Sequence, residues 1–135
     1  MDYSLEQTIL DSYFINGYRK RLGYELRNIN KRKRVLHSLC HNYASIIKPE
    51  ALNLIVSSDA TAIAKIILQQ GGSKERCYVM SLIANFDGVY VTLDDALESV
   101  VGNGMAALIY CNNGIAYFEA EQEQGPPPRF ILKSY

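Results

Sequence analysis

The stretch CYVMSLIANFDGVYV, residues 77–91, decides the fold class. Residues 77–86 are rich in side chains that favour strands, and Asp87-Gly88 is a strong hairpin turn before Val89-Tyr90-Val91, a second short run of the same type. Before Lys74 the apolar residues recur at helical spacing, so the hydrophobic period changes at this point in the chain. We therefore expect helices before this stretch and an antiparallel sheet from it onward.

The first half of the chain predicts about four helices. An apolar stripe with a spacing of four residues runs from Leu5 to Leu26, and Ser4 with Gln7 fits a capping box at its start. Glycines 17 and 23 weaken this helix, which we expect to end or bend near residue 22.

Three shorter helices are expected to follow the first. Asn30 is a plausible N-cap for residues 30–47, and Pro49 suits the first turn of a helix over 49–56. The fourth spans about 58–70, with Ser58 or Asp59 as its cap and Gly71-Gly72 after its end.

The second half adds a helix and three more strands to the opening hairpin. Thr92 with Asp95 caps a short amphipathic helix, and Asn113-Gly114 joins residues 105–111 and 115–119 as a second hairpin. After a proline-rich connection, residues 129–133 form the last strand. The expected order is β-β-α-β-β-β in a single α+β domain over 1–135, with a helical part at about 4–72 packed on a mainly antiparallel sheet part at about 76–135.

Composition places the chain among ordinary globular proteins. Of its 135 residues, 48% are hydrophobic and 21% are charged, and no apolar run approaches the roughly 20 residues that cross a bilayer. The N-terminal residues lack the apolar core of a secretion signal, and the three cysteines form no CxxC pair. We expect a cytoplasmic protein with reduced thiols and no membrane partner.

A net charge of zero conceals a division along the chain. Residues 1–50 hold nine Lys or Arg against five Asp or Glu, whereas residues 77–128 hold seven acids and neither Lys nor Arg. Such an asymmetry makes a molecule dipolar, and either pole can steer a charged partner.

The acidic pole predicts a protein-binding surface. Alternating glutamates after residue 118 would project from one face of an extended strand, beside acids on the neighbouring helix. Such a surface imitates a phosphate backbone and fits the basic cleft of a nuclease, although charge on an exposed strand also protects a sheet edge from aggregation. The expected partner-binding residues are Asp94, Asp95, Glu98, Glu119, Glu121 and Glu123.

The basic pole predicts nucleic-acid binding as the alternative. Its cations lie between residues 19 and 34, with tyrosines nearby for stacking on bases. Four consecutive cations spread around a helix, however, which also suits a solvated turn between two helices. The candidate residues are Arg19, Lys20, Arg21, Arg27, Lys31, Arg32, Lys33 and Arg34.

A second alternative is a metalloprotein or thiol enzyme at His37, Cys40 and His41. Histidines four residues apart share a helical face, and zinc would need a fourth ligand from Cys77, Cys111 or an acid. The ordinary interpretation places Cys40 in the core with a histidine on either side. As a nucleophile pair, Cys40 and His41 point about 100° apart on a helix and face each other poorly.

No phosphate-binding glycine loop, GxSxG, HExxH or EF-hand motif is present in the sequence. We therefore expect a binding protein rather than an enzyme, with no cofactor. The most specific hypothesis is an immunity-type inhibitor that neutralises a bacterial toxin, for example a basic nuclease, through the acidic surface.

Overall fold

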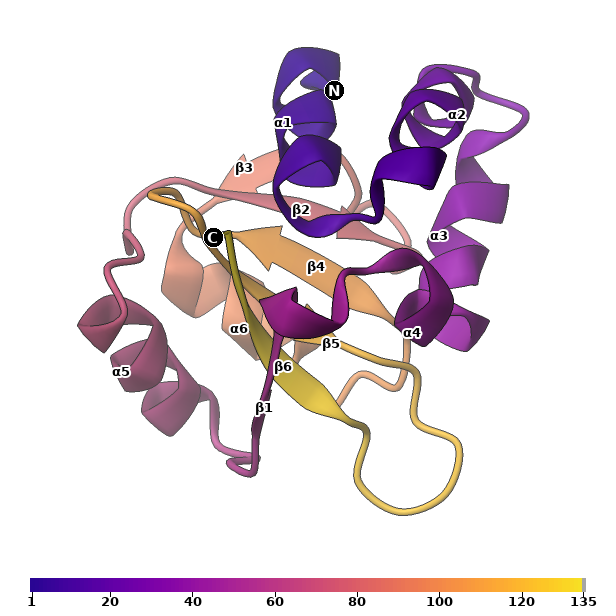
Figure 1. Cartoon of the computed structure of the whole chain (residues 1–135). Coiled ribbons are helices and arrows are strands. Elements are labelled where there is room, and N and C mark those ends of the chain that lie inside the picture. The colour runs from indigo at the N-terminus through magenta and orange to yellow at the C-terminus, as the bar shows by residue number, and fades with distance from the viewer. Residues whose placement is uncertain (135) are drawn as a thin grey trace.

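The structure, a computed structural model, describes residues 1–134. Six strands form one antiparallel sheet in the order β1-β6-β5-β4-β2-β3 (Figure 1). Tyr135, the last residue of the expected sheet part, lies outside the described residues. The strands are β1 (Leu52–Ile55), β2 (Cys77–Ser81), β3 (Val89–Val91), β4 (Ala107–Tyr110), β5 (Ile115–Glu119) and β6 (Arg129–Lys133).

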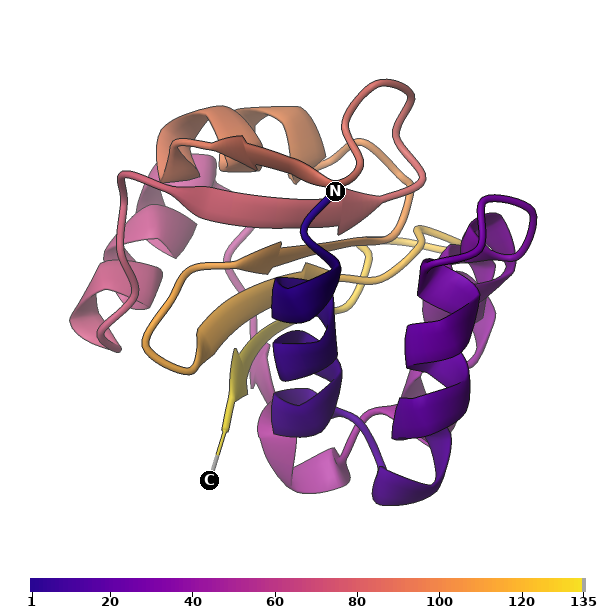
Figure 2. The same ribbon diagram turned by 90° about the horizontal axis from the view of Figure 1, so that it is seen from above.

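Helices cover both faces of the sheet, as Figure 2 shows from above. Packed against one face are α1 (Tyr3–Tyr13), α2 (Asn16–Leu26), α3 (Arg32–His41) and α4 (Tyr43–Ile46). Against the other face lie α5 (Ala60–Gln69) and α6 (Leu93–Val100). Because side chains alternate along a strand, β2 sends Tyr78 and Met80 into the first core and Val79 into the second.

The α+β class and the strand–helix order after Lys74 are confirmed. Local signals determine these elements: the Thr92 side chain accepts a hydrogen bond from the Asp95 amide at the start of α6, and Asp59 caps α5 in the same way. In the second hairpin Asn113 and Gly114 have φ angles of 55° and 76°, which the turn between β4 and β5 requires.

The single long helix expected after Ser4 was wrong. Asp2, not Ser4, is the N-cap of α1, and the chain leaves the helix at Phe14, whose extended backbone bridges to Ile47. The amide of Ile15 donates to the carbonyl of Ile46 at 2.8 Å. Pairing between segments some 30 residues apart therefore overrides a helical pattern that continues through the break.

The two helices expected between residues 30 and 56 were also placed wrongly. Helix α3 begins at Arg32 without a side-chain cap, and its end at Asn42 separates it from α4. A 3-10 helix, η1, occupies only Pro49–Ala51. Residues 52–55 form β1, which extends the sheet beyond β6.

The first expected strand was too long. The observed strand, β2, ends at Ser81 rather than at residue 86. The Ser81 hydroxyl donates a hydrogen bond to the carbonyl of Phe86 and so closes a loop before Asp87. In residues 1–134, no helix combines the length and the apolar character that crossing a bilayer requires.

Candidate functional site

One of the three alternating glutamates expected to bind a partner lies in the protein interior. Glu119 ends β5 with no solvent exposure, and its carboxylate accepts hydrogen bonds from the Tyr117 hydroxyl at 2.6 Å and the Arg129 guanidinium at 2.8 Å. The amide of Gly102 donates to its second oxygen at 3.0 Å. Burial, with the hydrogen bond to Glu119, raises the pKa of Tyr117 above its ordinary range. Glu119 therefore holds the fold together and offers no surface to a partner.

The strand geometry that would align the other two glutamates ends at the same residue. Beyond β5 the amide of Ala120 donates to the carbonyl of Pro128, and the amide of Gln122 donates to the carbonyl of Gly104. Residues 120–128 thus leave the sheet as a loop whose base is fixed. Glu121 is half-buried and Glu123 is exposed on this loop.

One residue of the expected basic segment is likewise internal. Arg32 is only 5% exposed, and its guanidinium bonds Glu6 at 2.5 and 2.7 Å and Asp87 at 2.7 and 3.0 Å. The Tyr78 hydroxyl donates to the same Glu6 carboxylate at 2.6 Å. This cluster ties α1, α3 and the β2–β3 loop together, so Arg32 is not a surface cation.

The remaining acids of the expected surface lie on α6. Asp94, Asp95 and Glu98 are exposed, while the opposite side of the helix packs into the core. Asp94 and Glu98 line a groove of about 400 Å³ between α5 and α6, together with Ala60, Thr61, Ala64 and Leu97. Among residues 1–134, none of these three carboxylates has a cation within 4 Å.

Part of the basic segment gathers at a groove between α1 and α2. Arg19, Lys20, Arg27 and Tyr24 line this hollow of about 760 Å³. The Lys31 ammonium lies 5.2 Å from the centre of the exposed Tyr24 ring. Of the other cations, Arg21 pairs with Glu25 within α2 at 3.6 Å, and residues 33 and 34 are exposed on α3.

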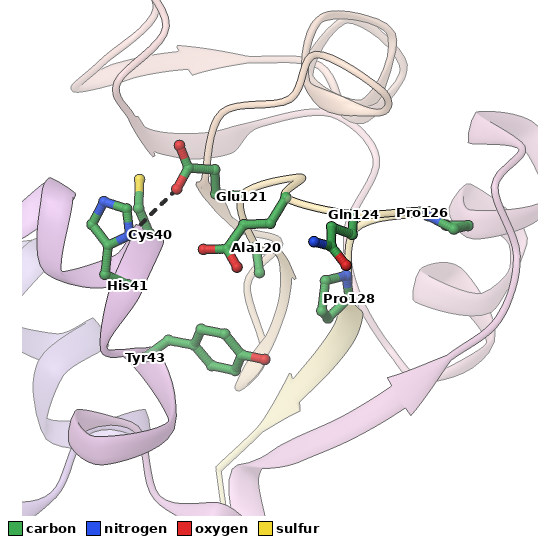
Figure 3. Close-up of a pocket in the computed structure, with 9 residues that line it drawn as sticks. Cys40, His41, Tyr43, Ala120, Glu121, Gln124, Pro126 and Pro128 are labelled. Atoms are coloured by element: carbon green, nitrogen blue, oxygen red, sulfur yellow. Dashed lines mark ion pairs between the residues drawn. The ribbon is translucent and has the colours of Figure 1, made fainter.

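A third group of polar side chains surrounds a pocket of about 470 Å³ at the end of α3 (Figure 3). Cys40, His41 and Tyr43 line one side, and Glu121 and Glu123 line the other. The Nδ1 atom of His41 lies 3.5 Å from Oε2 of Glu121. The structure thus joins part of the histidine–cysteine cluster to part of the acidic set.

The other residues of the expected metal or thiol site lie elsewhere. His37 is exposed and is not among the residues that line the pocket. Cys77 and Cys111, two suggested ligands, are buried in the core beneath α5 and α6. Burial raises the pKa of the Cys40 thiol, which opposes its use as a nucleophile.

Sequence reasoning missed the approach of the 120–128 loop to α3. The available signal was the run Pro126-Pro127-Pro128, which forces an extended return path after β5. That signal gives the shape of the loop but not the element on which it lies.

No protein-family model matches the chain, and no match was found among curated proteins or solved structures.

Proposed function

We propose that the protein is a cytoplasmic protein-binding module and, most specifically, an immunity-type inhibitor that neutralises a bacterial toxin such as a basic nuclease. The observation that carries the proposal is the unpaired acidic face of α6, formed by Asp94, Asp95 and Glu98. Glu121 and Glu123 add negative charge at a separate pocket. No catalytic residue belongs to this proposal.

The acidic face of α6 stands on a rigid support. Leu93, Ala96, Leu97 and Val100 fix the helix to the sheet, and each is at most 1% exposed. The backbone that carries these carboxylates needs no ordering when a partner binds, which favours affinity. The first-turn position of Asp94 and Asp95 also suits the helix dipole, so these acids stabilise α6 in addition to any binding role.

The groove beside the acidic face suggests which chemical group it receives. Its walls are Ala60, Ala64 and Leu97, and its rim carries the carboxylates of Asp94 and Glu98. An arginine or lysine side chain has the matching form, because its aliphatic stem packs on apolar walls while its cation meets the acidic rim. A toxin with a basic cleft presents such side chains, and opposite charges accelerate their association.

The proposal is tested with a panel of purified bacterial nuclease toxins, each assayed for nucleic-acid cleavage with and without the protein. The variant D94N/D95N/E98Q is compared with D11N/E50Q, which removes two exposed acids that line neither hollow beside α6. We expect the first variant to weaken inhibition by at least about tenfold and to lower the association rate, and the control to inhibit normally. Normal inhibition by the α6 variant, with a circular dichroism spectrum like that of the unaltered protein, would exclude this face.

Nucleic-acid binding is the second candidate, supported by the groove between α1 and α2. Arg19, Lys20 and Arg27 place three cations around one hollow, and Tyr24 adds an exposed ring on which a base can stack. A protein that neutralises phosphates releases counterions, so its affinity falls steeply as salt rises.

Titration with mixed tRNA and with duplex DNA at low salt tests this second candidate. If it holds, R19Q/K20Q/R27Q abolishes binding, while K33Q/R34Q, on α3 and outside the groove, weakens it only slightly. An equal loss in both variants would indicate general attraction rather than a site, and no binding by the unaltered protein would remove the candidate.

A further inference from the structure

The pocket at the end of α3 brings metal-binding side chains together from two distant parts of the chain. His41 is the last residue of α3, and Glu121 and Glu123 belong to the loop that follows β5. One donor atom from each residue lies within 4.8 Å of the others. An imidazole and two carboxylates thus converge from segments about 80 residues apart.

The separations are close to those of a coordinated ion. With bonds of about 2.1 Å to nitrogen and oxygen, two ligands of a tetrahedral ion lie about 3.4 Å apart. His41 Nδ1 and Glu121 Oε2 are already 3.5 Å apart. Glu123 places its donor atom within 4.8 Å of the other two, and its exposed side chain is free to change rotamer when an ion binds.

The surroundings favour a cation. Helix α3 ends at His41 and directs its partial negative charge toward the pocket. Two carboxylates add to this potential, and within residues 1–134 no Lys or Arg side chain lies within 4 Å of either carboxylate. Sites with three protein ligands and one open position are common for zinc, which water then completes.

We propose that His41, Glu121 and Glu123 form a binding site for a divalent transition-metal ion of the zinc type, which joins the end of α3 to the 120–128 loop. The imidazole ligand favours zinc over magnesium or calcium, which prefer oxygen ligands alone. The Cys40 thiol lines the same pocket but is not one of the three residues whose donor atoms converge.

Isothermal titration of the chelator-treated full chain with zinc chloride tests the proposal. We expect one zinc ion per chain and a melting temperature that rises with zinc concentration, because an ion that binds only the folded protein stabilises it. Magnesium chloride at the same concentration is expected to give neither effect.

Four variants identify the ligands. H41N and E123Q are each expected to weaken zinc binding by at least about tenfold, whereas H37N, which removes an exposed histidine of the same helix, leaves it unchanged. C40S is expected to bind zinc normally. Both His41 and Glu123 are exposed, so their variants retain the fold, and circular dichroism checks this.

Several outcomes would overturn the site. Absence of zinc binding in the unaltered protein would do so, as would binding that H37N weakens as much as H41N. Loss of zinc binding in C40S, together with full binding in E123Q, would show that the Cys40 thiol and not the Glu123 carboxylate is the ligand. Zinc binding can fail or succeed separately from toxin inhibition, because the acidic face of α6 shares no residue with the pocket at the end of α3.

Discussion

Replacing Arg32 with methionine is expected to destabilise the protein strongly, although this residue stands in a run of four cations that predicts a solvated segment. All five N–H groups of its guanidinium are used: four meet Glu6 and Asp87, and one meets the carbonyl of Leu26 at 3.2 Å. Methionine fills much of the space but donates no hydrogen bond. Glu6, which is 1% exposed, then keeps a buried charge without its cation.

The expected loss follows from that unpaired charge. Breaking a buried ion pair by removing one partner costs about 3–5 kcal/mol. At roughly 4 °C per kcal/mol for a domain of this size, the melting temperature falls by roughly 12–20 °C. The loss is a large part of the roughly 5–15 kcal/mol that stabilises a typical domain.

Urea unfolding followed by circular dichroism measures this loss directly. Lys33→Met, at the next position of α3 but exposed, is the matched control and is expected to change stability by less than about 0.5 kcal/mol. Adding E6Q and D87N to R32M removes the unpaired charges and is expected to recover at least about 1 kcal/mol. A loss below about 1 kcal/mol in R32M, or one equal to the control, would refute the buried cluster as a main support of the fold.

Three further outcomes are expected from other parts of the chain. Glu119→Gln leaves the Arg129 cation buried without an anion and lowers the free energy of unfolding by about 3–5 kcal/mol in urea titrations. A hydrogen bond from the Tyr90 hydroxyl lowers the pKa of Asp2 below its ordinary 3.8, so as pH falls the Asp2 carboxylate is protonated first in the unfolded chain. The stability that this hydrogen bond provides is therefore lost as pH falls from about 4 through the folded pKa. In an acid titration, D2N is expected to lose less stability than the unaltered protein. The thiols are buried, so iodoacetamide at neutral pH modifies them slowly in the native protein and rapidly in urea, as mass spectrometry would show for Cys40, Cys77 and Cys111.

The elements that sequence reasoning found are those fixed by neighbouring residues. The cap at Thr92 and the turn at Asn113-Gly114 each depend on contacts within a few positions. The elements it missed depend on distant partners. Strand β1 exists because it pairs with β6 nearly 80 residues later, and the break after Tyr13 exists because Phe14 pairs with Ile47.

The same distinction separates the candidate site residues. A carboxylate at position 119 has the same local signature whether it faces solvent or Arg129, and Arg32 meets Glu6 and Asp87 from 26 and 55 positions away. Exposure of a charged residue is therefore a tertiary property. The α6 acids were predictable as exposed because the apolar positions of that helix define its buried side.

The buried pairs leave the charge division intact. Within residues 1–50 the internal cluster takes one charge of each sign, Arg32 and Glu6, so the excess of four cations remains. Among the seven acids of residues 77–128, Asp87 and Glu119 turn inward and five stay at α6 and the 120–128 loop, still without a local cation. Salt weakens docking at either pole, because both attractions are electrostatic. The sign of the partner's charge decides which surface it binds. A basic protein binds the acidic face of α6, and a polyanion binds the groove between α1 and α2.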